Sequence, residues 1–158
     1  MVLTPKSLLR DKRAVSSLED LSTGSFRRII SDQREANAPA SRILLCSGKV
    51  YYDLVDARDE QKADTAVLRV EQLYPLTDEA IAAALKPYPQ ITPVYWVQEE
   101  PENMGAWPYL RRRFGEWLLG RYPFETIARP SSASPAAGSK RQHEAEQQEL
   151  LRRALERK

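Results

Sequence analysis

Four short apolar runs, separated by stretches with helical spacing, constrain the fold of this chain more than any other feature. The runs lie at residues 42–47, 65–70, 93–97 and 124–128 and are rich in β-branched and aromatic side chains. Continuous apolar runs of this length are typical of strands that are buried on both faces. A sheet built from such strands needs a layer of helices on each side.

The segments that follow the runs supply candidates for those helices. Residues 50–62 place apolar side chains at helical intervals, and Thr77 before two acidic residues predicts the start of a second helix. Pro87 and Pro89 end that second helix. Residues 140–158 predict a charged terminal helix that packs through a stripe of leucines.

A further helix is expected over residues 107–119. Its spacing turns Leu110, Phe114, Trp117 and Leu118 toward the core. Strands that alternate with helices predict an α/β fold of three layers, in which a mostly parallel sheet carries helices on both faces. The crossovers between parallel strands are expected to be right-handed.

The first 40 residues lack this alternation. Residues 1–5 resemble the end of a strand stopped by a proline, so Met1 is interpreted as a start residue added to a fragment. Within this segment, residues 16–21 predict a short helix that ends near Gly24, and residues 26–30 predict a strand. We therefore expect residues 1–40 to continue from a missing preceding domain and residues 41–158 to form the α/β domain.

Composition excludes several classes of function. A length of 158 residues suits one domain, and a net charge of +2 gives no reason to expect nucleic acid or an acidic membrane as partner. Neither a transmembrane run nor a signal peptide is present. The single cysteine, Cys46, excludes an internal disulfide and fits a buried structural thiol better than a reactive one. These features predict a cytoplasmic protein.

Two polar segments follow predicted strands, where ligands of α/β proteins bind. Residues 47–49 (Ser-Gly-Lys) precede a helix and could bind an anion, although they match no phosphate-binding motif and the glycine could serve only the turn. Glu99 and Glu100 could suggest an acid and a base. Adjacent strand residues point to opposite faces, so capping or interface carboxylates are the favoured interpretation.

The remaining candidates also favour structural roles. His143 is the only histidine, and a packed, hydrogen-bonded residue on the terminal helix is the favoured interpretation. The arginines at 111–113 and 152–153 are expected to be solvated and to pair with Glu116, Glu149 and Glu156. Because no nucleophile lies in a recognisable pattern with a base, an independent small enzyme is disfavoured.

Several segments, in the same order along the chain, resemble one family. They are residues 4–10 (TPKSLLR), 47–54 (SGKVYYDL), 69–75 (RVEQLYP), 96–107 (WVQEEPENMGAW) and 129–138 (RPSSASPAAG), with His143, Gln147 and Gln148 near the end. Together they are similar to the C-terminal domain of the first component of 2-oxoglutarate dehydrogenase. The related 2-oxoadipate dehydrogenases share this architecture and remain the alternative.

The resemblance implies a transketolase-like homodimer that decarboxylates 2-oxoglutarate on thiamine diphosphate and Mg²⁺ in the tricarboxylic acid cycle. Its partners would be the lipoyl succinyltransferase and the lipoamide dehydrogenase of the same complex. In the family, cofactor and metal lie in the preceding domains. This fragment is therefore expected to hold no cofactor and no metal, to have no catalytic residue, and to support the dimer.

An alternative role within the same enzyme is regulatory. The resemblance implies that, in actinobacterial relatives, this domain contributes to an acetyl-CoA site, and Arg10 and Gln72 match that pattern. Ser25, Glu79 and Ala80 stand where basic character is expected, which predicts weak phosphate capture. Lys6 beside Arg10 leaves a looser anion site as a further possibility. Tyr74, Trp107 and Tyr109 are expected to form an exposed apolar patch that neighbouring domains cover.

Overall fold

The computed structural model describes residues 5–34, 40–89 and 91–156. The expectation for residues 1–4 therefore lies outside the described residues. In chain order the elements are η1 (Leu8–Arg10), α1 (Leu18–Ser22), β1 (Ile29–Ile30), β2 (Arg42–Cys46), α2 (Val50–Gln61), β3 (Thr65–Val70), α3 (Asp78–Leu85), β4 (Val94–Pro101), α4 (Trp107–Phe114), β5 (Trp117–Leu118), β6 (Tyr122–Arg129) and α5 (Lys140–Leu155). Within these residues, no helix combines the length and hydrophobicity needed to cross a membrane.

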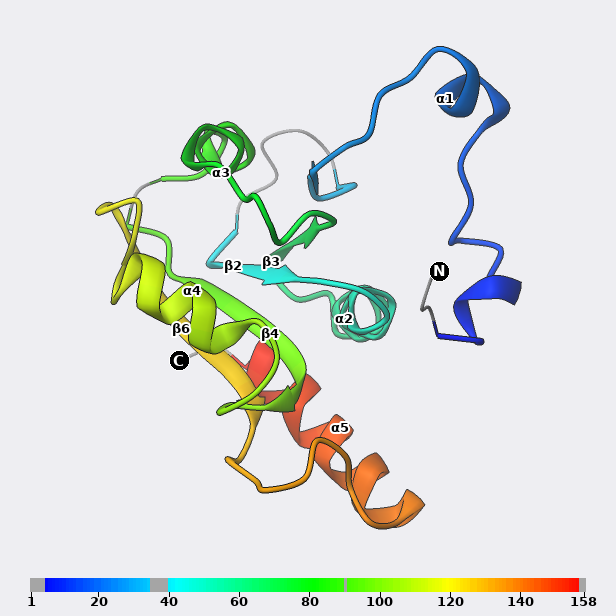
Figure 1. The fold of residues 1–158 in the computed structure, drawn as a ribbon, viewed down its shortest axis with the longest axis vertical. Helices are drawn as coiled ribbons and strands as arrows, with labels where there is room; N and C mark the ends of the chain where they lie inside the picture. The colour runs from blue at the N-terminus through cyan, green and yellow to red at the C-terminus, as the bar shows by residue number, and fades with distance from the viewer. Residues whose placement is uncertain (1–4, 35–39, 90, 157–158) are drawn as a thin grey trace.

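One sheet organises the molecule, with the strand order β1-β3-β2-β4-β6-β5 (Figure 1). The four inner strands are parallel, with Leu44 opposite both Val67 and Tyr95. The short edge strands β1 and β5 run antiparallel to their neighbours. The predicted α/β fold with a mostly parallel sheet is confirmed.

Each face of the sheet carries its own hydrophobic core. In β2, Ile43 and Leu45 belong to the cluster that contains residues of α3 and α4. Leu44 and Cys46 belong to the cluster that contains residues of α2 and α5. Strand side chains alternate between the two faces of a sheet, and here a hydrophobic core covers each face. Every residue of β2 is therefore buried. The predicted two-sided burial of the sheet is confirmed.

Side-chain caps begin three of the helices, α1, α3 and α5. The Thr77 side chain accepts a hydrogen bond from the backbone N–H of Ala80 at 3.3 Å, as its sequence context predicts. Ser139 caps α5 in the same way through Gln142, and Ser17 caps α1 through Asp20. The helices predicted in these three places are present.

The helix expected over residues 107–119 is shorter than predicted. It ends at Phe114 because Gly115 adopts φ +65°, a left-handed conformation that terminates a helix. The chain then turns into β5, where Trp117 lies opposite Pro123 and is 54% exposed. The prediction that Trp117 faces the core is wrong, whereas Leu110 and Leu118 are buried as predicted.

The predicted exposed patch is also corrected at one position. Trp107 is buried against Phe124, with ring centroids 5.3 Å apart, so it belongs to the core. Tyr74 and Tyr109 are exposed and lie edge to face with centroids 6.4 Å apart. The strand expected over residues 26–30 is reduced to β1, because only Ile29 and Ile30 pair with β3.

A buried glutamine shapes the loop that joins β4 to α4. The Gln98 Oε1 atom accepts hydrogen bonds from Trp96 Nε1 at 2.9 Å and from the Trp107 backbone N–H at 3.0 Å. Its Nε2 atom donates to the carbonyls of Pro101 and Met104. One side chain therefore makes these four hydrogen bonds, three of them buried, and fixes where α4 begins.

Replacing Gln98 tests this arrangement. In Gln98→Leu the buried partners lose their hydrogen bonds while volume is nearly kept, so we expect a loss of about 3 kcal/mol in the free energy of unfolding. Urea denaturation followed by circular dichroism measures it. Gln142→Leu removes only an exposed bond to Glu146 and should cost less than about 0.5 kcal/mol. Equal losses in the two variants would contradict the role of Gln98.

The two tryptophans of the α4–β5 region give a second test. Trp107→Ala empties a core position and should lower the free energy of unfolding by about 3–5 kcal/mol. Trp117→Ala removes a mostly exposed side chain and should cost less than about 1 kcal/mol. The same denaturation experiment compares the two variants. A larger loss of unfolding free energy in Trp117→Ala than in Trp107→Ala would contradict the early end of α4 and favour the longer helix that the sequence predicts.

Candidate functional site

A large cleft lies between the N-terminal arm, defined here as residues 5–28, and the body of the domain. Its volume is about 780 Å³. Side chains from the arm form one wall, and side chains from α2 and β3 form the other. We call it the arm cleft.

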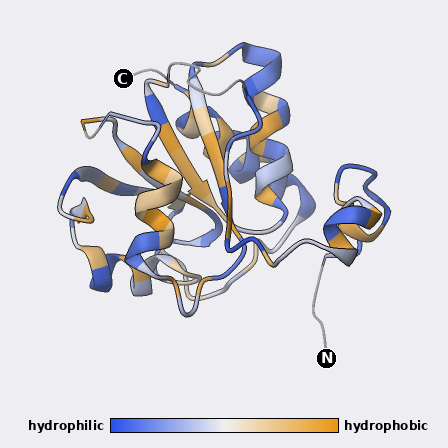
Figure 2. Ribbon diagram, turned by 90° about the horizontal axis from the view of Figure 1, so that it is seen from above, coloured by the Kyte–Doolittle hydropathy of each residue, from blue (hydrophilic) through white to orange (hydrophobic). Residues whose placement is uncertain are grey.

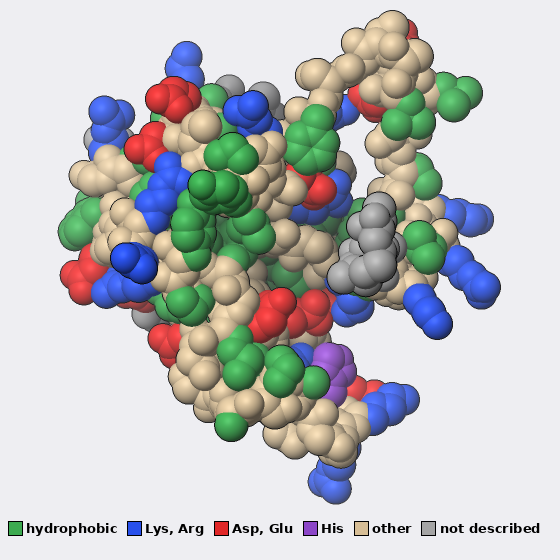
Figure 3. Space-filling model, viewed as in Figure 1, with side chains coloured by type: hydrophobic (Ala, Val, Ile, Leu, Met, Phe, Trp, Pro, Cys, Tyr) green, Lys and Arg blue, Asp and Glu red, His purple; other side chains and the backbone are tan. Residues whose placement is uncertain are grey.

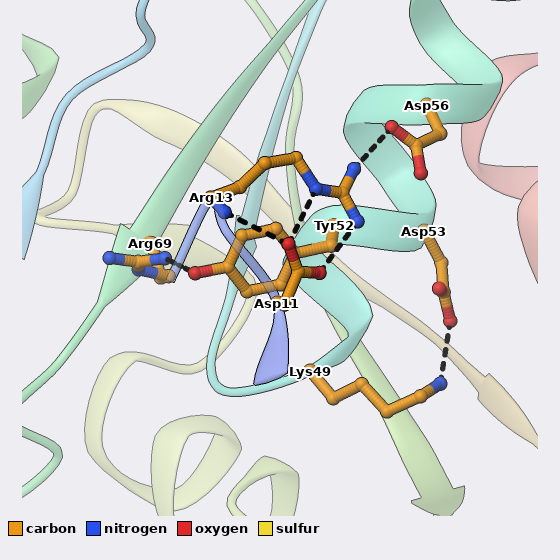
Figure 4. Close-up of polar contacts among 7 residues, drawn as sticks. All are labelled: Asp11, Arg13, Lys49, Tyr52, Asp53, Asp56 and Arg69. Atoms are coloured by element: carbon orange, nitrogen blue, oxygen red, sulfur yellow. Dashed lines mark hydrogen bonds and ion pairs between the residues drawn. The ribbon is translucent and has the colours of Figure 1, made fainter. Parts of the chain in front are cut away.

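Arg13 joins the arm to the body at this cleft. Its Nη1 atom donates to Asp56 Oδ1 at 2.6 Å, and its Nε and Nη2 atoms donate to the Asp11 carboxylate (Figure 4). The guanidinium lies 5.0 Å from the centroid of the Tyr52 ring. The hydrogen bonds from Arg13 lower the pKa of Asp11 to about 2. Arg13 therefore serves as a charged clip between two segments of the chain.

Arg69 occupies the opposite wall of the arm cleft. Its guanidinium lies 4.7 Å from the Tyr51 ring and 5.6 Å from the Tyr52 ring, and Nη1 donates to the Tyr52 hydroxyl at 2.9 Å. Its Nε atom lies 2.5 Å from Glu71 Oε1. Burial raises the pKa of Tyr51. Cation–π contacts and an ion pair thus hold Arg69 within the wall.

The charges that line the arm cleft are already paired with one another. Arg27 lies 2.7 Å from Asp20, while Arg13 and Arg69 pair with carboxylates as described. Each arginine that lines the cleft therefore has an acidic partner. Such a surface offers no unneutralised cation for a phosphate group.

A second polar cluster lies where the parallel strands end, the usual ligand position in this fold class. Lys49 Nζ lies 2.9 Å from Asp53 and 3.6 Å from Glu99, and Gln147 donates to Asp53 at 2.9 Å. Gly48 adopts φ +72° and forms the turn before α2. The lysine of the predicted anion site is thus neutralised, and Glu99 is one of the carboxylates that pair with it.

Arg129 completes this cluster from the end of β6. Its buried guanidinium contacts His143 Nδ1 at 3.1 Å, Gln147 Oε1 at 3.3 Å and Glu146 at 3.4 Å. Arginine only donates hydrogen bonds, so His143 Nδ1 accepts here. The prediction of a hydrogen-bonded histidine is confirmed. The prediction that it is packed is wrong, because His143 is exposed near the start of α5, beyond the leucine stripe.

The structure also tests the predictions for the surface arginines and for Cys46. Arg111 pairs with Glu116, and Arg152 pairs with Glu149 and Glu156, as expected. Cys46 is buried, and burial raises the pKa of its thiol, which makes it unreactive. Among the described residues, no group of three or more His, Cys, Asp or Glu side chains could hold a metal ion.

Arg10 and Gln72, the two candidate contacts for an anion, are not brought together by any contact between them. Arg10 ends η1 and is exposed, and its side chain forms no ion pair among the described residues. Gln72 Nε2 donates to the Pro75 carbonyl at 2.7 Å. Neither residue lines the arm cleft, whereas Ser25 lies in its wall.

Sequence reasoning singled out Lys49, Glu99 and His143 of the second cluster but missed the contacts that shape the arm cleft. Arg13 and Asp56 are 43 residues apart, and Arg69 and Tyr52 are 17 apart. No local pattern marks such pairs. Burial was the one available signal, because Arg69 and Arg129 each lie in a predicted strand or next to its end, where a charge needs a partner.

Comparison with known proteins identifies the family to which this chain is similar. A family profile described as "2-oxoglutarate dehydrogenase C-terminal" matches residues 15–155. The chain is 48% identical over 157 residues to the 2-oxoglutarate dehydrogenase E1 component of Cupriavidus necator, covering 98% of this chain and 16% of that protein. It is 42% identical over 160 residues to the Coxiella burnetii E1 component, covering 99% of this chain and 17% of that protein.

A third relative is a "Multifunctional 2-oxoglutarate metabolism enzyme" of Mycobacterium sp. strain JLS. It is 39% identical over 162 residues, which cover 98% of this chain and 13% of that protein. The chain thus spans about one sixth or less of the length of the curated relatives it matches. With its profile match, its relatives and its transketolase C-terminal-like sheet, the chain belongs to the 2-oxoglutarate dehydrogenase C-terminal family.

Proposed function

We propose that this chain is the C-terminal domain of the first component of 2-oxoglutarate dehydrogenase and that it supports the assembled enzyme without carrying its chemistry. One observation supports this most directly. In the arm cleft and in the second polar cluster, the cationic groups bind carboxylates of the same domain. Each of four such groups has an acidic partner: Arg13, Arg69, Lys49 and Arg129. Such groups hold the domain together and leave little charge for a substrate.

The described residues do not fit thiamine diphosphate and Mg²⁺. A diphosphate needs unneutralised donors, and Mg²⁺ needs a carboxylate site, whereas the arm cleft offers paired arginines and no metal-binding group was found among the described residues. We therefore place both in the preceding domains of the longer protein. No catalytic step is assigned to this chain.

The same proposal covers the partners and the location of the longer protein. Residues 1–40 would continue from the preceding domain, and residues 41–158 would form the transketolase-like C-terminal domain. The longer protein would be a cytoplasmic homodimer that oxidatively decarboxylates 2-oxoglutarate with the lipoyl succinyltransferase and the lipoamide dehydrogenase. The names of the relatives refer to 2-oxoglutarate, which favours 2-oxoglutarate over 2-oxoadipate as the substrate.

A regulatory role is the second candidate function, and one observation favours it. Arg10 is exposed and unpaired among the described residues, so its charge is available to an anion such as the phosphates of CoA. Gln72 remains its proposed companion. Against a strong site, Ser25, Glu79 and Ala80 add no positive charge.

Thermal unfolding in the presence of cofactor tests the first proposal. Millimolar thiamine diphosphate with Mg²⁺ should leave the Tm of the isolated chain unchanged, because a ligand stabilises only the fold that binds it. The Cupriavidus necator relative, measured in parallel as the positive control, should gain several degrees. A comparable gain in the isolated chain, or decarboxylation of 2-oxoglutarate by it, would place the cofactor site here.

Calorimetric titration with acetyl-CoA tests the regulatory candidate. We expect no binding in the micromolar range, because Arg10 is the only cation among the five positions of the family pattern, which are Arg10, Ser25, Gln72, Glu79 and Ala80. Arg10→Ala should therefore give the same flat titration as the unmodified chain. Micromolar binding that disappears in Arg10→Ala but persists in Arg112→Ala, an exposed arginine on α4, would establish the regulatory role instead.

A further inference from the structure

The arm carries an unusual concentration of exposed apolar side chains. Leu9, Val15, Leu18, Leu21 and Phe26 are each between 70% and 85% exposed. Neither η1 nor α1 contains a buried residue. Figure 2 shows the arm as a lobe that stands apart from the body, with hydrophobic residues on it. Exposed apolar side chains clustered in this way mark an interaction surface.

The arm's own contacts with the body are too few to explain its apolar sequence. Arg13 and Asp56, which form its main link, are about half exposed, and exposed ion pairs contribute about 0–1 kcal/mol. A helix of five residues such as α1 is not stable by itself. The arm is attached at its two ends: Leu8 and Ala14 pack against the core cluster of α2 and α5, and the Arg28 carbonyl accepts backbone hydrogen bonds from Glu71 and Gln72. Between these ends, the side chains of Val15, Leu18, Leu21 and Phe26 are all at least 70% exposed.

The apolar side chains of the arm also face the arm cleft. Val15, Leu21 and Phe26 line one wall, and Tyr51, Tyr52 and Val55 line the other wall together with charged residues. A space of about 780 Å³ between two partly apolar walls is large enough for several side chains of another polypeptide. Leu9 and Leu18 are exposed and do not line the cleft, so the apolar surface of the arm extends beyond it. Figure 3 shows hydrophobic side chains on the surface of the arm.

The charged side chains that line the arm cleft indicate which kind of ligand it can accept. The cleft is lined by three arginines, Arg13, Arg27 and Arg69, and each is neutralised by an acidic neighbour. A phosphorylated ligand would have to displace these carboxylates. A polypeptide with apolar side chains would cover the walls and leave the ion pairs in place at the rim.

We propose that the arm and the arm cleft together form a docking surface for an apolar segment in the preceding part of the longer protein. This inference rests on the proposed function. The relatives are about six times longer than the matched region, and the matching profile describes a C-terminal region. The segments that precede it are therefore joined directly to the arm, which gives them a high effective concentration at this surface.

The experiment compares the free chain with a full-length hybrid. In the hybrid, this chain replaces the 157 matched residues of the Cupriavidus necator relative. Limited trypsin digestion at Arg27 and Arg28, which are exposed in the free chain, reports whether the arm is covered. We expect cleavage to slow at least about tenfold in the hybrid, because a docked arm must open before it is cut.

A double variant, Leu21→Asp with Phe26→Asp, identifies the surface. Both side chains are exposed in the free chain, so its Tm should change by less than about 2 °C. In the hybrid the same variant should restore fast cleavage and lower the Tm by several degrees. Ile91→Asp, which alters an even more exposed apolar side chain of the body, should leave cleavage unchanged in both proteins.

The outcomes separate this inference from the proposed function. An active hybrid whose arm is cut as fast as that of the free chain, or whose double variant behaves like the unmodified hybrid, overturns the docking surface alone. A hybrid that is insoluble or inactive beside an active relative overturns the proposed function and the inference with it. A free chain that dimerises in sedimentation through Leu21 and Phe26 would make a second copy the occupant, which also overturns the inference.

Discussion

The structure depends on the burial of its central parallel strands on both faces. Strand β2 has parallel neighbours on both edges and hydrophobic side chains on both faces, and every residue in it is buried. A fully buried Leu or Ile contributes about 1.5–3 kcal/mol relative to an exposed one, and this requires helices above and below the sheet. The crossovers that parallel pairing demands supply those helices. The burial of the strands on both faces therefore accounts for both the parallel sheet and the helices that cover it.

The polar residues follow from the same constraint. Where charges lie at the margins of this core, they need partners, and the chain supplies them from distant segments. Arg42 donates to carbonyls at the end of α5, Arg129 contacts α5 side chains, and Arg58 pairs with Asp32. Groups bound in this way contribute to specificity of folding, and their hydrogen-bonding capacity is largely used within the domain. A domain built so is suited to support other domains rather than to transform a substrate.

The elements that the sequence predicts well are those determined by local pattern. The strands β2, β3, β4 and β6, the cap of α3, and the burial of Cys46 all follow from apolar runs, helical spacing or a capping residue. Predictions fail where a backbone conformation or a tertiary contact that the pattern does not mark decides the structure. The conformation of Gly115 ends α4 early and exposes Trp117, and contact with Phe124 places Trp107 in the core. The pairing of Arg13 with Asp56 leaves no local trace, so the arm cleft could not be predicted.

The contrast between a firmly packed body and a weakly attached arm is the central physical claim. Native-state hydrogen exchange on the free chain measures it directly. We expect the backbone amides of β2 and β4 to exchange only through global unfolding, with the slowest rates in the chain. We expect the amides of residues 15–26 to exchange faster than those strands by several orders of magnitude. Arm amides as slow as those of β2 would show that the arm belongs to the folded core and would contradict the account.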